Sequence, residues 1–290
     1  MLALKSKIGR TYIFTSTLIS IGIVFLILVS LFTESFEAIT ANGTEFFSTN
    51  WNPEDGKFGV LPMLYGTLAS TLIALTIAVP LGLLTAIFLS EFLPKKYRIV
   101  FKSFIELLAG IPSIIYGLIG IAFLSIWIQN LFDLQSGRTI LTAGILLGVM
   151  LLPTIITLVD DAFNAIPNHY RESSRGLGLY PYEIIQLTLL PMCKRDIIGA
   201  ILLALGRALG ETMAVMLVIG SIDKIPETVF NFLSPGQTIT SKLGREIAET
   251  SFGSLHFSAL ILMGLILLVI VISVTLIAQL SFSNTDRIYE

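Results

Sequence analysis

Long runs of apolar residues dominate the chain and predict helices that cross a membrane. About 20 helical residues are needed to span the hydrocarbon core of a bilayer. Runs of this length predict six spans, at Tyr12–Phe32, Leu61–Phe92, Leu107–Ile128, Thr139–Val159, Asp196–Ile222 and Leu255–Phe282. The second run is too long for one straight crossing and too short for two crossings with a turn, so we expect one helix bent at Pro80. The predicted fold class is an all-α integral membrane protein with six transmembrane helices.

Lysine and arginine residues between the spans predict the orientation, because positive residues are retained on the cytoplasmic side. With the N-terminus inside, the cytoplasmic segments hold twelve Lys and Arg residues, Arg287 among them, and the outer segments hold five. The basic cluster from Lys95 to Lys102 then also lies inside. Both termini are therefore predicted to be cytoplasmic.

Composition agrees with a membrane protein and excludes several classes of function. Hydrophobic residues make up 54% of the 290 residues and charged residues only 13%. The net charge of -2 provides no broad basic surface for nucleic acid. One cysteine and two histidines make a structural metal site or a haem unfavourable, so we expect no cofactor in this chain. No polar segment is long enough for its own core, which predicts a single transmembrane domain over residues 1–290, with lipid as its surroundings.

The segment between the fourth and fifth spans, residues 160–195, predicts an organised cytoplasmic loop. A helical pattern follows Pro167 and stops before Gly178. A second short helix is expected to begin near Pro181, since proline is tolerated in a first helical turn, and to end before Pro191. Two short helices joined by a glycine turn would form a compact protrusion on which another protein can dock.

This loop resembles the coupling loop of the permeases of ATP-binding-cassette importers. Their signature is Glu-Ala-Ala, three residues, Gly, nine residues, Ile, one residue and Leu-Pro. The chain carries it at the same spacing, with serine or threonine in place of the Ala and Ile residues, as Glu172, Ser173, Ser174, Gly178, Thr188, Leu190 and Pro191. The resemblance implies a helix that fits a groove of the ATPase subunit and transmits its nucleotide-driven closure. An ordinary surface loop that uses these residues as caps and turns is the alternative.

The chain has no phosphate-binding G-x-x-x-x-G-K-[ST] motif, because its one Gly-Lys pair, Gly56-Lys57, precedes Phe58. We therefore expect a transport subunit that is not itself an enzyme. ATP and Mg would bind partner subunits.

The fifth predicted span contains two charged residues, Arg207 and Glu211, four positions apart. A lone arginine at the centre of a span costs about 2.5–3.5 kcal/mol on insertion scales, so it needs a partner or a wet path. Arg207 is predicted to line a path and offer its planar donors to an anion, with Glu211 holding it when the path is empty. An ion pair that only fixes helix packing is the alternative. In the third span, Pro112 predicts a kink, and Ser113 beside it either faces the path or only packs.

Four stretches carry a fuller resemblance to the phosphate-specific permeases of these importers, of the PstC type. They are Tyr65–Phe92, Glu106–Gly120, the loop Glu172–Pro191 and Gly206–Gly220. The resemblance implies a type I importer permease fold in a bacterial or archaeal cytoplasmic (inner) membrane. It also implies a PstA-type second permease subunit, two ATPase subunits and an extracytoplasmic phosphate-binding protein. The charged residues of the phosphate path carry over onto Arg207 and Glu211.

Two other functions stay open. A permease for tungstate, molybdate or sulfate would also use an arginine, since these anions share tetrahedral geometry with phosphate. A secondary anion transporter driven by an ion gradient could use the same charged pair. Such transporters generally contain inverted repeats, and no inverted repeat is visible in this sequence. The 160–195 loop would also have no role in a secondary transporter.

Overall fold

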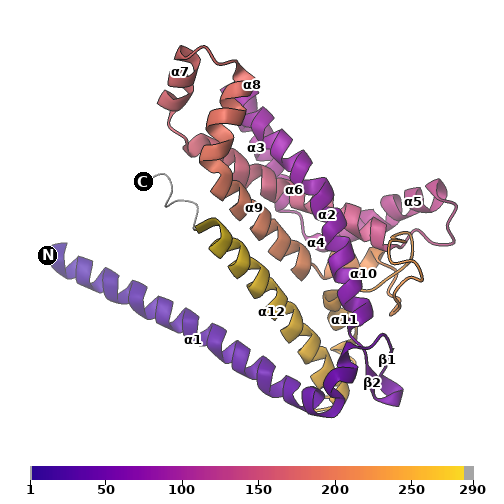
Figure 1. The fold of residues 1–290 in the computed structure, drawn as a ribbon. Coiled ribbons are helices and arrows are strands. Elements are labelled where there is room, and N and C mark those ends of the chain that lie inside the picture. The colour runs from indigo at the N-terminus through magenta and orange to yellow at the C-terminus, as the bar shows by residue number, and fades with distance from the viewer. Residues whose placement is uncertain (1, 284–290) are drawn as a thin grey trace.

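The computed structural model describes residues 2–283, and Figure 1 shows an elongated bundle of helices. Arg287 and the predicted cytoplasmic C-terminal end lie outside the described residues. The helices are α1 (Leu2–Asn42), α2 (Leu61–Ile87), α3 (Lys95–Ala109), α4 (Ser113–Ile119), α5 (Ile126–Leu131), α6 (Ile140–Ala165), α7 (Asn168–Gly176), α8 (Pro181–Glu183), α9 (Leu190–Gly210), α10 (Met213–Val218), α11 (Ile239–Glu246) and α12 (Leu255–Ser283). Strands β1 (Trp51–Asn52) and β2 (Lys57–Phe58) pair antiparallel, and π turns or 3-10 turns extend several helices.

Five helices in the described part of the chain are long and apolar enough to cross a membrane. They run over Tyr12–Phe47, Leu61–Phe92, Ser113–Leu131, Ile140–Ala165 and Leu255–Ala278. These helices match the first, second, third, fourth and sixth predicted spans. A sixth crossing, made by α9 and α10 together, remains a prediction.

The third predicted span has a wrong start. Leu107 belongs to α3, which ends at Ala109, and the crossing helix begins only at Ser113. Pro112 has no backbone N–H and takes an extended ψ of 137°, so the expected kink is a complete break between two helices.

The second span is one helix, as predicted. Pro80 lies inside α2 without ending it, and a π turn over Phe88–Phe92 prolongs the helix. The predicted bend at Pro80 stays a prediction.

The core forms where α2 packs along α6 through small residues. A Cβ atom at Gly82 would lie 2.7 Å from Ile155 Cγ2, and one at Gly144 would lie 2.6 Å from the Ile73 side chain. Glycine at these positions allows the two helix backbones to approach closely. The α2–α6 contact is the most extensive helix contact in the described structure.

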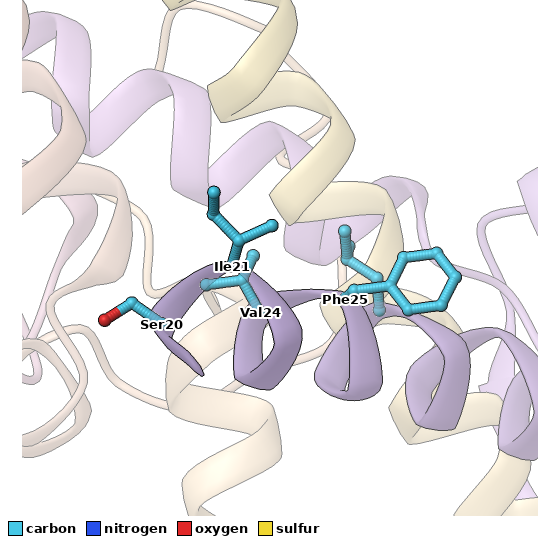
Figure 2. Close-up of a pocket in the computed structure, with 5 residues that line it drawn as sticks. Ser20, Ile21, Val24 and Phe25 are labelled. Atoms are coloured by element: carbon cyan, nitrogen blue, oxygen red, sulfur yellow. The ribbon is translucent and has the colours of Figure 1, made fainter. Parts of the chain in front are cut away.

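The loop of α7 and α8 and the hairpin of β1 and β2 lie at opposite ends of the bundle in Figure 1. We call them the loop end and the hairpin end. Helix α1 meets the bundle near the hairpin and diverges from α12 toward its N-terminus. Ser20, Ile21, Val24 and Phe25 line a shallow apolar hollow on its surface (Figure 2), a face suited to lipid tails or another apolar helix.

Candidate functional site

The predicted fifth span is broken next to its charged residues. Helix α9 ends at Gly210 and α10 begins at Met213, with Glu211 in an extended conformation between them. The break is braced by α11, because the Thr240 hydroxyl donates a hydrogen bond to the Glu211 carbonyl oxygen at 2.7 Å. A backbone carbonyl freed inside a span needs such a partner, since lipid cannot provide one.

Arg207 lies in the last turn of α9, where the carbonyl end of a helix favours a cation. Its Nη1 donates a hydrogen bond to Thr154 Oγ1 of α6 at 2.9 Å. The side chain is exposed, and no ion pair of the described residues includes it. The guanidinium is therefore held by a neutral hydroxyl, and its remaining donors are available to an anion.

Glu211 does not form the ion pair with Arg207 that the sequence predicts. Its Oε1 instead accepts a hydrogen bond from the Ala214 N–H, in the first turn of α10, at 3.2 Å. The physical reason is the break, because the i,i+4 geometry of the predicted pair requires a helix that continues past Gly210. Arg207 thus lies at the C-terminal end of α9, and Glu211 lies next to the N-terminal end of α10.

The backbone beside Arg207 borders open space. A Cβ atom built at Gly206 or Gly210 meets no atom within 4 Å in the described structure. Between α2 and α6, in contrast, a Cβ atom built at Gly82, Gly144 or Gly148 lies within 4 Å of an atom of the facing helix. This side of α9 can therefore line a path or receive another subunit.

The structure brings Thr154 to Arg207, and among the described contacts it does not bring Ser113 to it. Ser113 is the first residue of α4 and is half-buried. Sequence reasoning missed Thr154. A hydroxyl after Pro153 inside an apolar span was the one signal that could have indicated Thr154.

The loop of residues 160–195 contains the two short helices that the sequence predicts. Helix α7 ends at Gly176, and Gly178 has a φ of +82°, which L-residues rarely adopt. The second helix does not end before Pro191, however. It continues from α8 through a π turn at Ile184–Leu189 into α9, because the wider turn accommodates the missing N–H of Pro191.

The signature residues divide into an exposed and a buried set. Glu172, Ser173 and Gly178 are exposed, whereas Ser174 is 5% exposed. Ser174 and Thr188, which both differ from the family signature, form a hydrogen bond with each other at 3.0 Å. The two departures thus compensate one another and fasten α7 to the π turn before α9.

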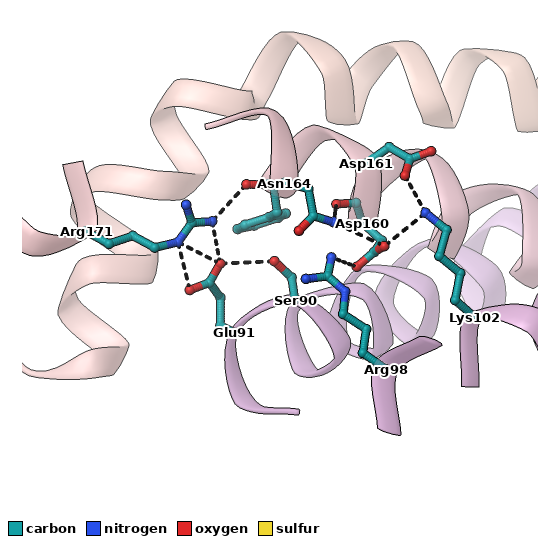
Figure 3. Close-up of polar contacts among 9 residues, drawn as sticks. Ser90, Glu91, Arg98, Lys102, Asp160, Asp161, Asn164 and Arg171 are labelled. Atoms are coloured by element: carbon teal, nitrogen blue, oxygen red, sulfur yellow. Dashed lines mark hydrogen bonds and ion pairs between the residues drawn. The ribbon is translucent and has the colours of Figure 1, made fainter. Parts of the chain in front are cut away.

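Two partly buried ion-pair clusters lie at the base of this loop (Figure 3). In one, Asp160 of α6 accepts from Arg98 Nη2 at 2.5 Å and from Lys102 Nζ at 3.3 Å, both on α3. In the other, Glu91 pairs with Arg171 of α7. Sequence reasoning missed both clusters, since the partners are 58 to 80 positions apart along the chain.

Comparisons with known proteins show which class of membrane protein carries these helix breaks and this two-helix loop. The chain belongs to the family of binding-protein-dependent transport system inner membrane components, which matches residues 78–286. Within that family, it is 37% identical to the phosphate transport system permease protein PstC of Mesorhizobium japonicum, over 94% of this chain and 90% of the relative. It is 36% identical to the probable ABC transporter permease protein YqgH of Bacillus subtilis, over 90% of this chain and 85% of the relative.

Solved structures show the same fold at low sequence identity. A chain of the MetNI methionine ABC transporter, in an inward-facing conformation, matches with a TM-score of 0.56 at 18% identity, over 76% of this chain and 91% of that one. A chain of a bacterial ABC transporter involved in the import of alginate matches with a TM-score of 0.57 at 16% identity, over 95% and 96%. The fold is therefore that of an ABC importer permease, a multi-pass inner membrane protein.

Proposed function

We propose that the chain is the PstC-type permease subunit of an ATP-driven importer of inorganic phosphate and forms half of the translocation path. The observation that carries this proposal is Arg207, a cation inside a predicted span whose one anchor among the described residues is the neutral Thr154 hydroxyl. A guanidinium fork matches two oxygens of a tetrahedral oxyanion, and charge-assisted hydrogen bonds of this kind are the strong ones. The PstC names of the relatives support phosphate as that anion.

The remaining predicted site residues take different places in this proposal. Glu211 lies extended in the break beside Arg207, and its side chain accepts a hydrogen bond from the first turn of α10. Ser113 begins the crossing part of the third span after a second break. Both residues would then shape the path through the backbone.

The proposed assembly contains a PstA-type second permease subunit, two ATPase subunits and an extracytoplasmic phosphate-binding protein. ATP and Mg would bind the ATPase subunits. The surface proposed to receive an ATPase subunit is α7 with the exposed signature residues Glu172 and Ser173, next to exposed Leu177 and Tyr180. Apolar side chains that are this exposed at the tip of a loop are typical of a binding site.

The test is uptake of radiolabelled phosphate by cells that carry the wild-type chain or Arg207→Ala. The proton gradient and membrane potential are collapsed while ATP is maintained. Wild-type uptake should continue, and Arg207→Ala should lower it at least about tenfold, since a hydrogen bond to a charged group contributes about 1.5–3 kcal/mol. The complex should still assemble. Arg207→Lys is the matched variant, which keeps the charge and removes the fork.

Each contrary outcome has a defined meaning. Uptake that stops with the gradient would indicate a secondary transporter. If unlabelled tungstate, molybdate or sulfate competes with the labelled anion and unlabelled phosphate does not, the competing anion would replace phosphate in the proposal. Unchanged uptake by Arg207→Ala would refute the path role.

Gly178→Leu tests the docking role of the loop. Because Gly178 has a positive φ and open space around its Cβ position, the substitution strains the backbone turn without a steric clash. A left-handed conformation costs an L-residue roughly 1–2 kcal/mol, so the turn should shift to another conformation. We expect purified complexes to lose most transport-coupled ATP hydrolysis, and normal coupling would contradict a docking role. Gly253→Leu, at a position outside this loop with a similarly positive φ of +76° and equally open space, is the control.

A further inference from the structure

One side chain, Arg171, joins the docking helix α7 to two transmembrane helices (Figure 3). Its Nη2 donates to Glu91 Oε1 at 2.7 Å, and its Nε lies 3.2 Å from both Glu91 oxygens. Its Nη2 also donates to the Phe163 carbonyl oxygen at 2.8 Å, and its Nη1 donates to that of Ile166 at 2.9 Å. All three nitrogens of the guanidinium are therefore engaged.

The partners of Arg171 lie at the ends of different spans. Glu91 is in the π turn that prolongs α2, and Ser90 Oγ donates to the same carboxylate oxygen at 3.0 Å. Phe163 is in the last turn of α6, and Ile166 is its C-cap. Arg171 itself directly precedes Glu172 of the docking signature. A single planar group thus fixes α7 against α2 and α6 at once.

Burial and geometry make this contact stiff. The Arg171 and Glu91 side chains are 13% and 12% exposed, so water screens their attraction weakly. A bidentate pair also fixes direction as well as distance, which a lysine ammonium cannot do. One helical turn after Arg171, α7 is also held by the Ser174–Thr188 hydrogen bond to the turn before α9.

We propose that the Arg171–Glu91 pair is the link that carries a displacement of α7 to α2 and α6, and hence that both residues are positioning residues for transport coupling. The proposal rests on the proposed function in one respect, namely that α7 receives the ATPase subunit. A force on α7 then reaches the α2–α6 core through Arg171 and reaches α9, which carries Arg207, through Thr188. Without Glu91 as its partner, Arg171 would keep its hydrogen bonds to the two carbonyl oxygens of α6 and lose its link to α2, so ATP hydrolysis would move α7 with less movement of the core.

The experiment compares phosphate uptake and ATP hydrolysis in the same proteoliposomes, which contain the complete complex and the phosphate-binding protein. Glu91→Gln and Arg171→Lys should each lower phosphate transported per ATP hydrolysed at least about fivefold, with ATP hydrolysis per assembled complex within about twofold of wild type. The variant that carries both Glu91→Gln and Arg171→Lys should transport no less phosphate per ATP than either single variant. The effects of two substitutions that break the same link are not additive. If Glu91→Gln fails to assemble, Glu91→Asp, which keeps the charge and shortens the reach, serves the same test.

Arg98→Lys is the matched control. It weakens a comparably buried pair, Arg98–Asp160, that joins α3 to α6 and does not contact α7. Its transport per ATP should stay within about twofold of wild type, even if the complex is less stable. A ratio that falls equally in Arg98→Lys, or that does not fall in Glu91→Gln and Arg171→Lys, would overturn the link. If the two pair variants and Gly178→Leu all leave transport coupled to ATP hydrolysis, the docking role of α7 fails together with the link. If Gly178→Leu uncouples transport and the two pair variants do not, only the link is refuted.

Discussion

Replacing Gly66 with alanine should prevent the folded protein from accumulating in the membrane. A Cβ atom on Gly66 would lie 2.1 Å from the backbone oxygen of Gln237, a distance at which something must shift. The obstacle is backbone and cannot rotate away. It is also tied in place, because the Ile239 N–H donates to Thr67 Oγ1 at 3.0 Å and Gln237 is fully buried. Overpacking usually costs about 1–3 kcal/mol, and a backbone obstacle places this variant at or above the upper end.

The measurement is the amount of membrane-inserted protein and the melting temperature of the detergent-solubilised protein. Gly199→Ala is the matched control, since Gly199 also lies inside a helix and a Cβ there meets nothing within 4 Å. It should be neutral or slightly stabilising, because alanine is the better helix former. Equal stability of the two variants would mean that α2 does not pack against residue 237 as the structure shows.

Asp160→Ala should be the most destabilising change at the loop end. Asp160 is 2% exposed, and its carboxylate accepts from Arg98 and Lys102 of α3 and, at 3.3 Å, from Asn164 Nδ2. Its removal leaves the partly buried Arg98 guanidinium without its carboxylate partner. Breaking a buried ion pair in this way costs about 3–5 kcal/mol.

Denaturation of the solubilised protein measures this cost. Asp161→Ala is the control, because its carboxylate is 58% exposed and exposed ion pairs contribute about 0–1 kcal/mol. A loss of stability in Asp160→Ala no larger than in Asp161→Ala would contradict a stabilising role for the buried cluster. Asp160→Asn, which keeps an acceptor and loses the charge, should fall between the two.

The sequence predicted helices well where the backbone forms its hydrogen bonds within one uninterrupted helix. A long apolar run must be helical in a membrane, because every backbone group needs an internal partner. Helices α2 and α12 follow their predicted ranges closely, and α6 begins as predicted and continues past Val159 to Ala165. The sequence predicted poorly where another element supplies that partner. The break after Gly210 depends on the Thr240 hydroxyl, from a segment 29 positions away, and no local pattern reports such a contact.

The candidate site shows the same division. Arg207 could be singled out from the sequence because a charge inside an apolar run has to be explained. Its anchor Thr154 could not, since the contact exists only after α6 and α9 pack together. Ion pairs such as Glu91–Arg171 join residues 80 positions apart and were equally invisible. The Ser174–Thr188 contact, between two residues that depart from the family signature, likewise exists only after α7 packs on the turn before α9.

The glycine contacts between α2 and α6 limit how this subunit can change shape. A Cβ at Gly82, Gly144 or Gly148 would press on the facing helix, so the two helices interlock along their length and cannot slide past each other. The third and fifth predicted spans are instead segmented, at Pro112 and at Glu211. We therefore expect α2 and α6 to move as one body and the chain to bend at the two breaks. In the proposed importer, alternating access would be a motion at these breaks, and Arg207, one turn before the break at Glu211, would change its surroundings when that break bends.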